Sequence, residues 1–145
     1  MKKKALVLVC AALVAILAMT ACSGGTEAVT VKGVRLAKGL DANYQPVDPT
    51  TQFFATDTIR VSVTLSGSPS KGVINGKFFY GDQSISEVSL DLAQVNLGNV
   101  IRFGGDSYVA FNLAPSQPWP VASNYRFELY VDGKKIGDYP YAVIQ

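Results

Sequence analysis

The side chains that carry most enzyme chemistry are scarce in this sequence. It contains no histidine, and its two cysteines, Cys10 and Cys22, both lie near the start of the chain. The Ser-His and Cys-His arrangements of nucleophilic catalysis and the usual zinc sites therefore cannot be built. A Ser-Lys pair occurs at Ser70-Lys71, but it lies in a polar segment where we expect both side chains to be solvated turn residues.

The carboxylates do not form a recognisable catalytic or metal-binding pattern. Cleavage of a glycoside by two acids requires them about 5–9.5 Å apart in a cleft. The acids here are scattered singly in turns or on an outward strand position, and we expect them to serve solubility: Asp41, Asp48, Asp82, Asp106, Asp132 and Glu128. Asp41, Asn43 and Asp48 share an oxygen-rich loop, but the twelve-residue calcium pattern is missing. We predict no metal, no other cofactor and no enzymatic activity.

Aromatic side chains are the remaining candidates for function. We expect Tyr80, Tyr108 and Tyr130 on outward or ambiguous strand positions, and Trp119 lies in a proline-rich loop. Exposed aromatic rings stack on sugars or anchor a protein partner. Cross-strand packing of the tyrosines, and a role for Trp119 as a plug over one end of the fold, are the structural alternatives.

The first 21 residues have the pattern of an export signal. Three lysines at positions 2–4 precede an uninterrupted apolar stretch over residues 5–18, and small residues follow. A basic start, a short apolar run and a small-residue exit are typical of a signal peptide, expected here as a helix. Counted to Cys22 the segment has about 18 residues, which is short for a helix that crosses a bilayer.

The end of this segment resembles a bacterial lipobox, in which a cysteine receives lipid and becomes the first residue after cleavage. Thr20 and Ala21 suit the positions before Cys22, whereas Met19 stands where leucine is usual. The resemblance implies lipidation of Cys22 and a membrane anchor, since two or more acyl chains hold a protein stably. Cleavage after Ser23 to give a secreted protein, and an uncleaved anchor, stay open as alternatives.

The charge of the exported part differs from that of the whole chain. The chain has thirteen Lys and Arg against eleven Asp and Glu, a net +2. Three of the lysines belong to the signal segment, which leaves ten bases against eleven acids, a net charge near −1. We therefore expect no nucleic-acid partner. If Cys22 is lipidated, no thiol remains for a disulfide, and the remaining domain of about 124 residues must be stabilised by its core alone.

Residues 29–113 show the alternation of β-strands. Apolar residues alternate with polar ones most strictly in residues 58–66. Further strands are expected at 73–80, 88–92 and 108–113, and residues 100–103 are a weaker candidate. The alternation of residues 29–36 changes phase at Gly33, which predicts a β-bulge. Residues 39–57 hold two prolines and are expected to be a long connection with a short strand at residues 52–54.

The last third predicts a hairpin. The prolines of residues 114–120 exclude regular structure, and alternation resumes at residues 125–131. Asp132-Gly133 is typical of a type I′ turn, and a return strand should run over residues 134–144 with a bulge at Gly137. Pro140 lacks an amide hydrogen, so this strand should be an edge or pair on one side only there. Seven or eight short strands predict an antiparallel two-sheet β-sandwich.

Residues 54–143 resemble the immunoglobulin-like β-sandwich modules of bacterial envelope lipoproteins. The similarity is carried by residues 54–63 and by the stretch from Trp119-Pro120 to Lys134, although Ala122 replaces a usual glycine. It implies that Tyr125 is a "tyrosine corner", with its hydroxyl bonded to the backbone upstream, and that Phe127 stands where an antibody domain has a cysteine. The fold by itself implies no activity.

These inferences predict three segments: a signal peptide (1–21), a lipidated cysteine with a flexible tether (22–28) and an immunoglobulin-like domain (29–145). We expect a protein anchored by lipid in the bacterial cell envelope, outside the cytoplasm, on the outer membrane or the outer face of the cytoplasmic membrane. Its expected function is non-enzymatic binding of a protein or glycan partner. A structural spacer, an enzyme inhibitor and an unfamiliar enzyme are the alternatives.

Overall fold

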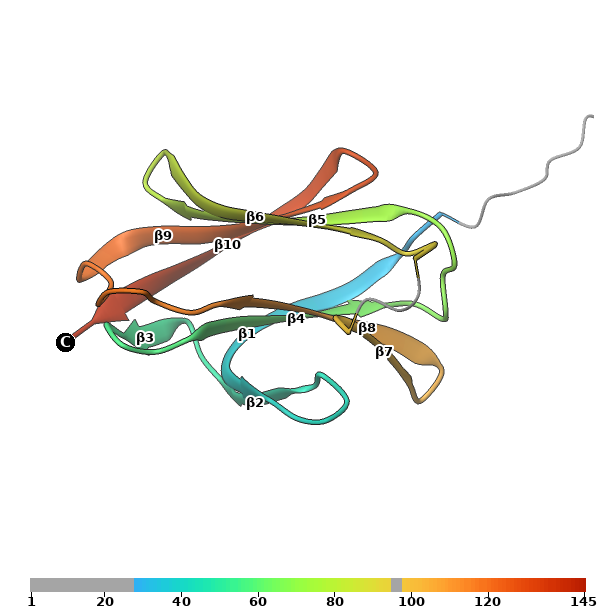
Figure 1. The fold of residues 1–145 in the computed structure, drawn as a ribbon, viewed down its shortest axis with the longest axis horizontal. Coiled ribbons are helices and arrows are strands. Elements are labelled where there is room, and N and C mark those ends of the chain that lie inside the picture. Colours follow the sequence, from blue (N-terminus) through green and yellow to red (C-terminus); the bar gives the residue numbers. More distant parts are fainter. Residues whose placement is uncertain (1–27, 95–97) are drawn as a thin grey trace, which may run out of the picture.

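The computed structural model describes residues 28–94 and 98–145, which form ten β-strands and no helix. The strands form two five-stranded sheets that lie face to face as the layers of a sandwich (Figure 1). The first sheet has the order β2-β1-β4-β8-β7 and the second the order β3-β10-β9-β5-β6. The expected all-β architecture of two packed sheets is therefore confirmed. None of the described residues belongs to a helix that could cross a membrane.

The strands of the first sheet are β1 (Val31–Leu40), β2 (Pro46–Pro49), β4 (Ile59–Leu65), β7 (Val100–Phe103) and β8 (Asp106–Leu113). Those of the second sheet are β3 (Gln52–Phe54), β5 (Val73–Tyr80), β6 (Gln83–Asp91), β9 (Ala122–Val131) and β10 (Lys134–Ile144). All neighbours are antiparallel except β3 and β10, which run parallel. The predicted signal helix lies outside the described residues.

The predicted count of seven or eight strands is too low, since the described residues form ten. One strand, β2, was predicted as part of a connection. β2 begins and ends with a proline, Pro46 and Pro49, and it pairs with the outer edge of β1. A strand at the edge of a sheet has one side without partners, so prolines without an amide hydrogen are tolerated there. The short strand predicted at residues 52–54 is present as β3.

The core lies between the sheets and is built by the predicted alternation. In β4, Ile59, Val61, Val63 and Leu65 are fully buried. On the facing sheet, the inward residues of β9 are also buried: Tyr125, Phe127, Leu129 and Val131. Period-two alternation places every second side chain on one face, so each strand contributes a continuous apolar row to the core.

The predicted irregularities of the strands are confirmed. The pairing of β1 with β4 shifts between Val31 and Gly33, and that of β10 with β9 shifts between Lys135 and Gly137. Asp132 and Gly133 both have positive φ, as a type I′ turn requires. At Pro140, β10 pairs with β9 alone, because β3 reaches only residues 142–144.

The sandwich has two ends, which we name by their distance along the fold from Ala28. At the proximal end, β1 begins, residues 66–72 connect β4 to β5, and the turns at Gly104 and at Gly133 reverse the chain. At the distal end, Gly81 turns the chain from β5 into β6, and residues 114–121 connect β8 to β9. Figure 1 shows the proximal end on the right and the distal end on the left.

Candidate functional site

The four predicted binding aromatics do not form one patch. Tyr130 lies on the outer face of the second sheet, and Tyr108, opposite Thr64, lies on the outer face of the first. Tyr80 ends β5 on the inner side of its sheet, and Trp119 lies in the proline-rich connection to β9. Only Tyr80 and Trp119 are brought together, and they meet at the distal end of the sandwich.

Tyr80 and Trp119 line a small hollow that we name the aromatic cleft. It has a volume of about 260 Å³ and is lined by Tyr80, Gln83, Ser84, Ile85, Trp119, Pro120 and Tyr125. Gly81 turns the chain back at the end of β5, and this places residues 83–85 beside Tyr80. The rings of Tyr80 and Tyr125 pack with centroids 4.8 Å apart, so the buried Tyr125 supports the Tyr80 ring beside the cleft.

Hydrogen bonds to the backbone fix Trp119 at the edge of the cleft. Its indole Nε1 donates to the carbonyl of Asp57 at 3.1 Å, and its amide donates to the carbonyl of Ala55 at 2.8 Å. The ring also packs against the core, which agrees with the predicted role as a plug over one end. A fixed indole loses little conformational freedom when it contacts a ligand.

The hydroxyl of Tyr125 bonds to the loop that contains Trp119. It donates to the carbonyl of Pro120 at 2.8 Å, so the predicted bond to upstream backbone is present. Burial raises the pKa of Tyr125, and the nearby Tyr80 adds to this shift. Tyr125 is therefore a neutral structural group near pH 7 rather than a base.

The chemistry open to the aromatic cleft is stacking and hydrogen bonding without charge. No charged side chain lines it. Gln83 and Ser84 are exposed, and neither side chain makes a hydrogen bond to another described residue. An amide and a hydroxyl beside flat rings can bind a neutral hydroxylated or amide-bearing group, but they offer no acid or base for catalysis near pH 7.

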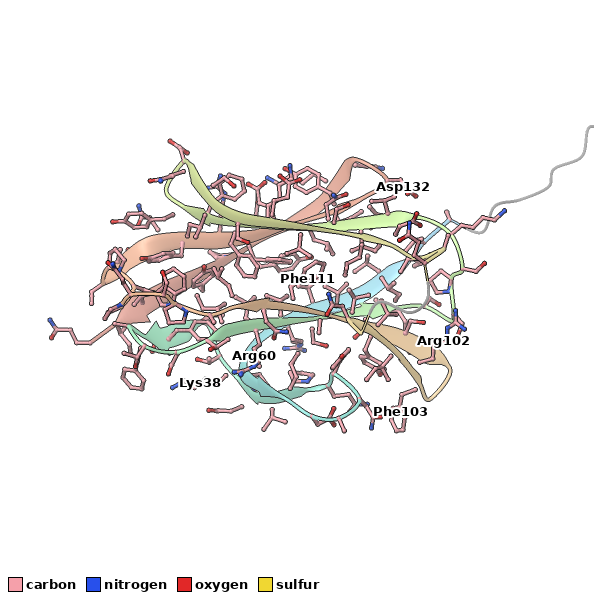
Figure 2. All side chains as sticks on the ribbon, in the orientation of Figure 1. Lys38, Arg60, Arg102, Phe103, Phe111 and Asp132 are labelled. Atoms are coloured by element: carbon pink, nitrogen blue, oxygen red, sulfur yellow. The ribbon has the colours of Figure 1, made fainter. Side chains whose placement is uncertain are left out.

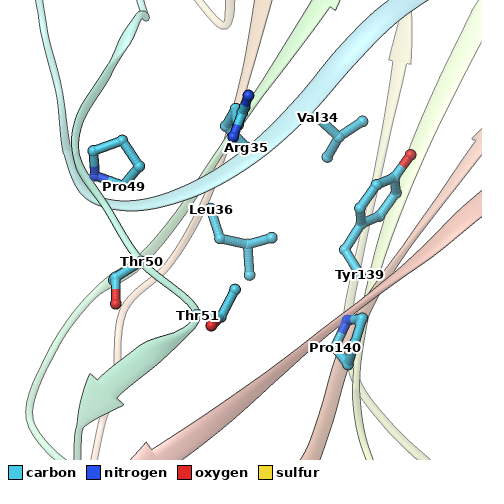
Figure 3. A pocket seen from close by; sticks show the side chains of 8 residues that line it. All are labelled: Val34, Arg35, Leu36, Pro49, Thr50, Thr51, Tyr139 and Pro140. Carbon is cyan, nitrogen blue, oxygen red and sulfur yellow. The ribbon is translucent and has the colours of Figure 1, made fainter.

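A second, larger cleft runs along the open side of the sandwich between β1 and β10 (Figure 3). It has a volume of about 460 Å³ and is lined by Val34, Arg35, Leu36, Pro49, Thr50, Thr51, Tyr139 and Pro140. No carboxylate lines it, and Arg35 is its one charged side chain. Burial raises the pKa of Tyr139, and the neighbouring Asp138 adds to the shift. Paired acids for glycoside cleavage are absent from both clefts.

Two of the acids that we predicted in turns accept hydrogen bonds from backbone amides. Asp41 accepts from the amides of Asn43 and Gln45, both at 2.8 Å, and Asp132 accepts from the amide of Val73 at 2.8 Å. Residues 28–94 and 98–145 contain no group of three or more acidic, histidine or cysteine side chains that could hold a metal ion. Ser70 and Lys71 are exposed in the loop between β4 and β5, as expected.

Glu128 corrects one prediction. It points outward from β9 but is only 4% exposed, rather than lying free on the surface. Its carboxylate accepts from Arg126 Nε at 2.8 Å and from the Tyr130 hydroxyl at 2.7 Å, and it pairs with Lys135 Nζ at 3.1 Å. Burial opposes ionisation, but these partners outweigh it and lower the pKa of Glu128 to about 2.

This cluster also assigns a structural role to Tyr130. Its hydroxyl is bound to Glu128, and Lys77 Nζ lies 5.0 Å from the centre of its ring. The hydrogen bond to Glu128 raises the pKa of Tyr130, and burial adds to the shift. Both parts of the side chain therefore stabilise the outer face of the second sheet, and Tyr130 is not part of a binding patch with Tyr80 and Trp119.

The fold and the site together define an all-β sandwich domain with a small, uncharged aromatic cleft at one end. A scan against models of known protein families finds no match, and neither does a search of curated protein sequences. Cys22, the predicted lipidation site, lies outside the described residues.

Proposed function

We propose that the protein is a lipid-anchored, non-enzymatic binding module of the bacterial envelope, and that it binds a glycan in the aromatic cleft. One observation carries the proposal: the cleft lies at the distal end, opposite the proximal end, where the domain follows the predicted anchor in the chain. A site at the far end of an anchored domain is the one most accessible to a partner. Lipidation of Cys22 after removal of residues 1–21 supplies the anchor.

The strand order supports an immunoglobulin-like arrangement for this module. Such sandwiches combine one sheet of strands A, B, E and D with another of strands G, F, C and C′. The order β1-β4-β8-β7 corresponds to the first of these sheets, and β10-β9-β5-β6 corresponds to the second. The hydrogen bond from Tyr125 to the carbonyl of Pro120 corresponds to the tyrosine corner.

The lining of the cleft favours a neutral glycan over other ligands. The faces of sugar rings stack on aromatic side chains, and sugar hydroxyls bond to amide and hydroxyl groups such as those of Gln83 and Ser84. The volume, about 260 Å³, lies just below the ~300–1,000 Å³ of pockets that enclose small molecules. One ring at the end of a larger glycan is therefore the expected occupant.

Binding of envelope glycans by the purified full chain tests the proposal. We expect Trp119→Phe and Tyr80→Ala each to weaken binding about tenfold, since an aromatic contact contributes roughly 1–2 kcal/mol. Tyr108→Ala, an outward tyrosine away from the cleft, is the matched control and should leave binding unchanged. Equal losses in all three variants would contradict a site in the cleft.

A structural spacer is the second candidate, because the four predicted aromatics are dispersed instead of forming one exposed patch. A photo-crosslinking residue at Ser84, in the cleft, and another at Ser89, exposed on the same strand, separate the two functions in intact cells. A binding module gives a product from position 84 alone. A spacer gives no product from either position. A crosslink to a protein from position 84 alone would show that the partner is a protein and not a glycan.

A further inference from the structure

The cleft between β1 and β10, which we name the lateral cleft, lies beside a strand edge that has no partner. β2 pairs with residues 37–40 of β1, and the chain then crosses to the second sheet, where β3 pairs with residues 142–144 of β10. No other described strand pairs with this edge of β1. Residues 34–36 of β1 therefore line the cleft at a position in the first sheet that another strand can fill.

The free hydrogen-bonding groups of this edge belong to Val34 and Leu36. The carbonyl of Leu36 accepts from the amide of Thr50 at 3.0 Å, so Leu36 presents its backbone groups away from β4. Backbone direction alternates along a strand, so the amide and carbonyl of Val34 face the same way, while those of Arg35 face β4. The Leu36 amide and both groups of Val34 have no partner among the described residues. An extended peptide can bind to such a row through its own backbone.

The β10 wall of the lateral cleft offers no backbone donor. The amide of Ala142 donates to the carbonyl of Thr51 at 2.9 Å, so residues 142 and 140 of β10 present their backbone groups away from β9. Residue 140 is a proline, and the one residue of β10 that lines the cleft and faces this way therefore has no amide hydrogen. A proline at a strand edge discourages the addition of another strand. An added strand thus pairs with β1 rather than with β10.

The side chains of β1 define what the added strand must carry. Val34 and Leu36 point toward the core, and Tyr139 lies across the cleft from Val34 (Figure 3). Arg35 is exposed on the opposite face of β1 and forms no ion pair with a described residue. The residue opposite Arg35 would lie in a non-hydrogen-bonded pair, in which the two side chains are closest. A carboxylate at that position can pair with the guanidinium.

A second copy of the chain fits this edge less well than an acidic partner. The antiparallel register that uses the free groups of both copies places Val34 of one copy opposite Leu36 of the other. Arg35 then lies directly opposite Arg35 of the second copy, and like charges in a cross-strand pair are destabilising. No carboxylate lines the lateral cleft to offset this repulsion. Charge complementarity therefore favours a partner that brings its own acid.

We propose that the lateral cleft binds an extended peptide segment of a partner protein, which adds to β1 as an edge strand. The segment places an aspartate or glutamate opposite Arg35, between two apolar residues that rest against Val34, Leu36 and Tyr139. The inference goes beyond the proposed glycan site and depends neither on that site nor on the anchor, since no residue lines both clefts. Loss of glycan binding would leave it unchanged.

Peptide binding by the purified full chain tests the inference. The probe is a fluorescently labelled peptide of alternating threonine and valine with a central glutamate between two valines, and the matched peptide has glutamine in place of the glutamate. We expect Arg35→Gln to weaken binding of the glutamate peptide about fivefold, the upper end for an exposed ion pair, and to leave binding of the glutamine peptide unchanged. Arg102→Gln, an exposed base at the other edge of the same sheet, is the control and should change neither.

Hydrogen exchange measured by NMR identifies the edge at which the peptide binds. The glutamate peptide should slow exchange of the amides of Val34 and Leu36, because both gain a partner. Ser89 supplies the control amide. The amide of Leu92 donates to the carbonyl of Gly72, so Ser89, three residues earlier, presents its amide to the free edge of β6. Its exchange should not change.

Four outcomes would each overturn the proposal. They are the absence of binding, an equal loss of both peptides in Arg35→Gln, and protection of Ser89 in place of Val34 and Leu36. The fourth is protection of Val34 and Leu36 that rises with protein concentration without peptide, because it identifies a second copy of the chain as the occupant.

Discussion

A Cβ atom added to Gly76 of β5 would lie 2.7 Å from two ring carbons of Phe111, which comes from β8 in the opposite sheet. It would also lie 2.8 Å from the ring of Phe127. Figure 2 shows Phe111 between the two sheets. The absent side chain at Gly76 is therefore what allows the Phe111 ring to fill the centre of the core.

Gly76→Ala should destabilise the protein by overpacking this contact. Forcing a methyl group into a filled core costs about 1–3 kcal/mol, because neither buried ring can move without displacing others. Urea unfolding measures the loss. Gly33→Ala is the matched control, since a Cβ atom there meets nothing within 4 Å. In a Phe111→Leu background the cost of Gly76→Ala should shrink, and equal costs in both backgrounds would contradict the contact.

Removal of the hydroxyl group should affect stability differently at two buried tyrosines. The hydroxyl of Tyr125 donates to Pro120 at 2.8 Å, whereas the hydroxyl of Tyr141 is buried and has no partner among the described residues. Tyr125→Phe should cost about 0.5–1.5 kcal/mol, the net value of one hydrogen bond. Tyr141→Phe should be neutral or stabilising, because it removes an unpaired polar atom from the core. Thermal unfolding of the two variants compares them directly, and a larger loss for Tyr141→Phe would contradict this assignment.

Stability at acid pH should depend on Glu128. Its pKa is lowered to about 2 in the folded protein from about 4.5 when unfolded, so the stabilisation is complete above pH 4.5 and is lost as the pH falls toward 2. We expect a loss of about 1–2 kcal/mol over this range, less than the full shift implies because the charged partners Arg126 and Lys135 are partly solvated. Denaturant unfolding at several pH values between 2 and 6 measures it.

Glu128→Gln should lower the stability at pH 6 and flatten this part of the pH profile. Glu87→Gln is the control on the same face of the second sheet: it removes a more exposed ion pair, 3.2 Å from Lys77, that contributes about 0–1 kcal/mol. A pH profile of Glu128→Gln parallel to that of the unaltered protein would show that another carboxylate is responsible.

The sequence predicted the parts of the fold that depend on neighbours along the chain. Alternation fixes which face of a strand a side chain occupies, so the buried rows of β4 and β9 were found correctly. Local backbone requirements revealed the bulge at Gly33, the turn at Asp132-Gly133 and the one-sided pairing at Pro140. Each of these follows from a few consecutive residues.

Contacts between distant segments account for what was missed. Alternation placed Glu128 outward but could not show that Lys135, from the next strand, and Arg126 would cover it. Position 76 requires glycine because the ring of Phe111 packs against it, and Phe111 lies 35 positions later in the chain and in the other sheet. The sequence predicted two residues of the aromatic cleft, Tyr80 and Trp119. Gln83, Ser84 and Tyr125 were missed because the turn at Gly81 and the loop before β9 bring them to the cleft only in the folded structure.

The predicted anchor and the fold should be separable by a change at Cys22. Cys22→Ser removes the thiol that would carry the lipid, so incorporation of a palmitate analogue and retention in the membrane fraction should both be lost. Cys10→Ser, within the predicted signal, is the control and should keep both. The unfolding transition of the domain should not change, because residues 23–145 contain no cysteine and no disulfide can be broken. Unchanged labelling of Cys22→Ser would exclude Cys22 as the lipidated residue, whereas a lack of labelling of the unaltered protein would favour secretion or an uncleaved anchor.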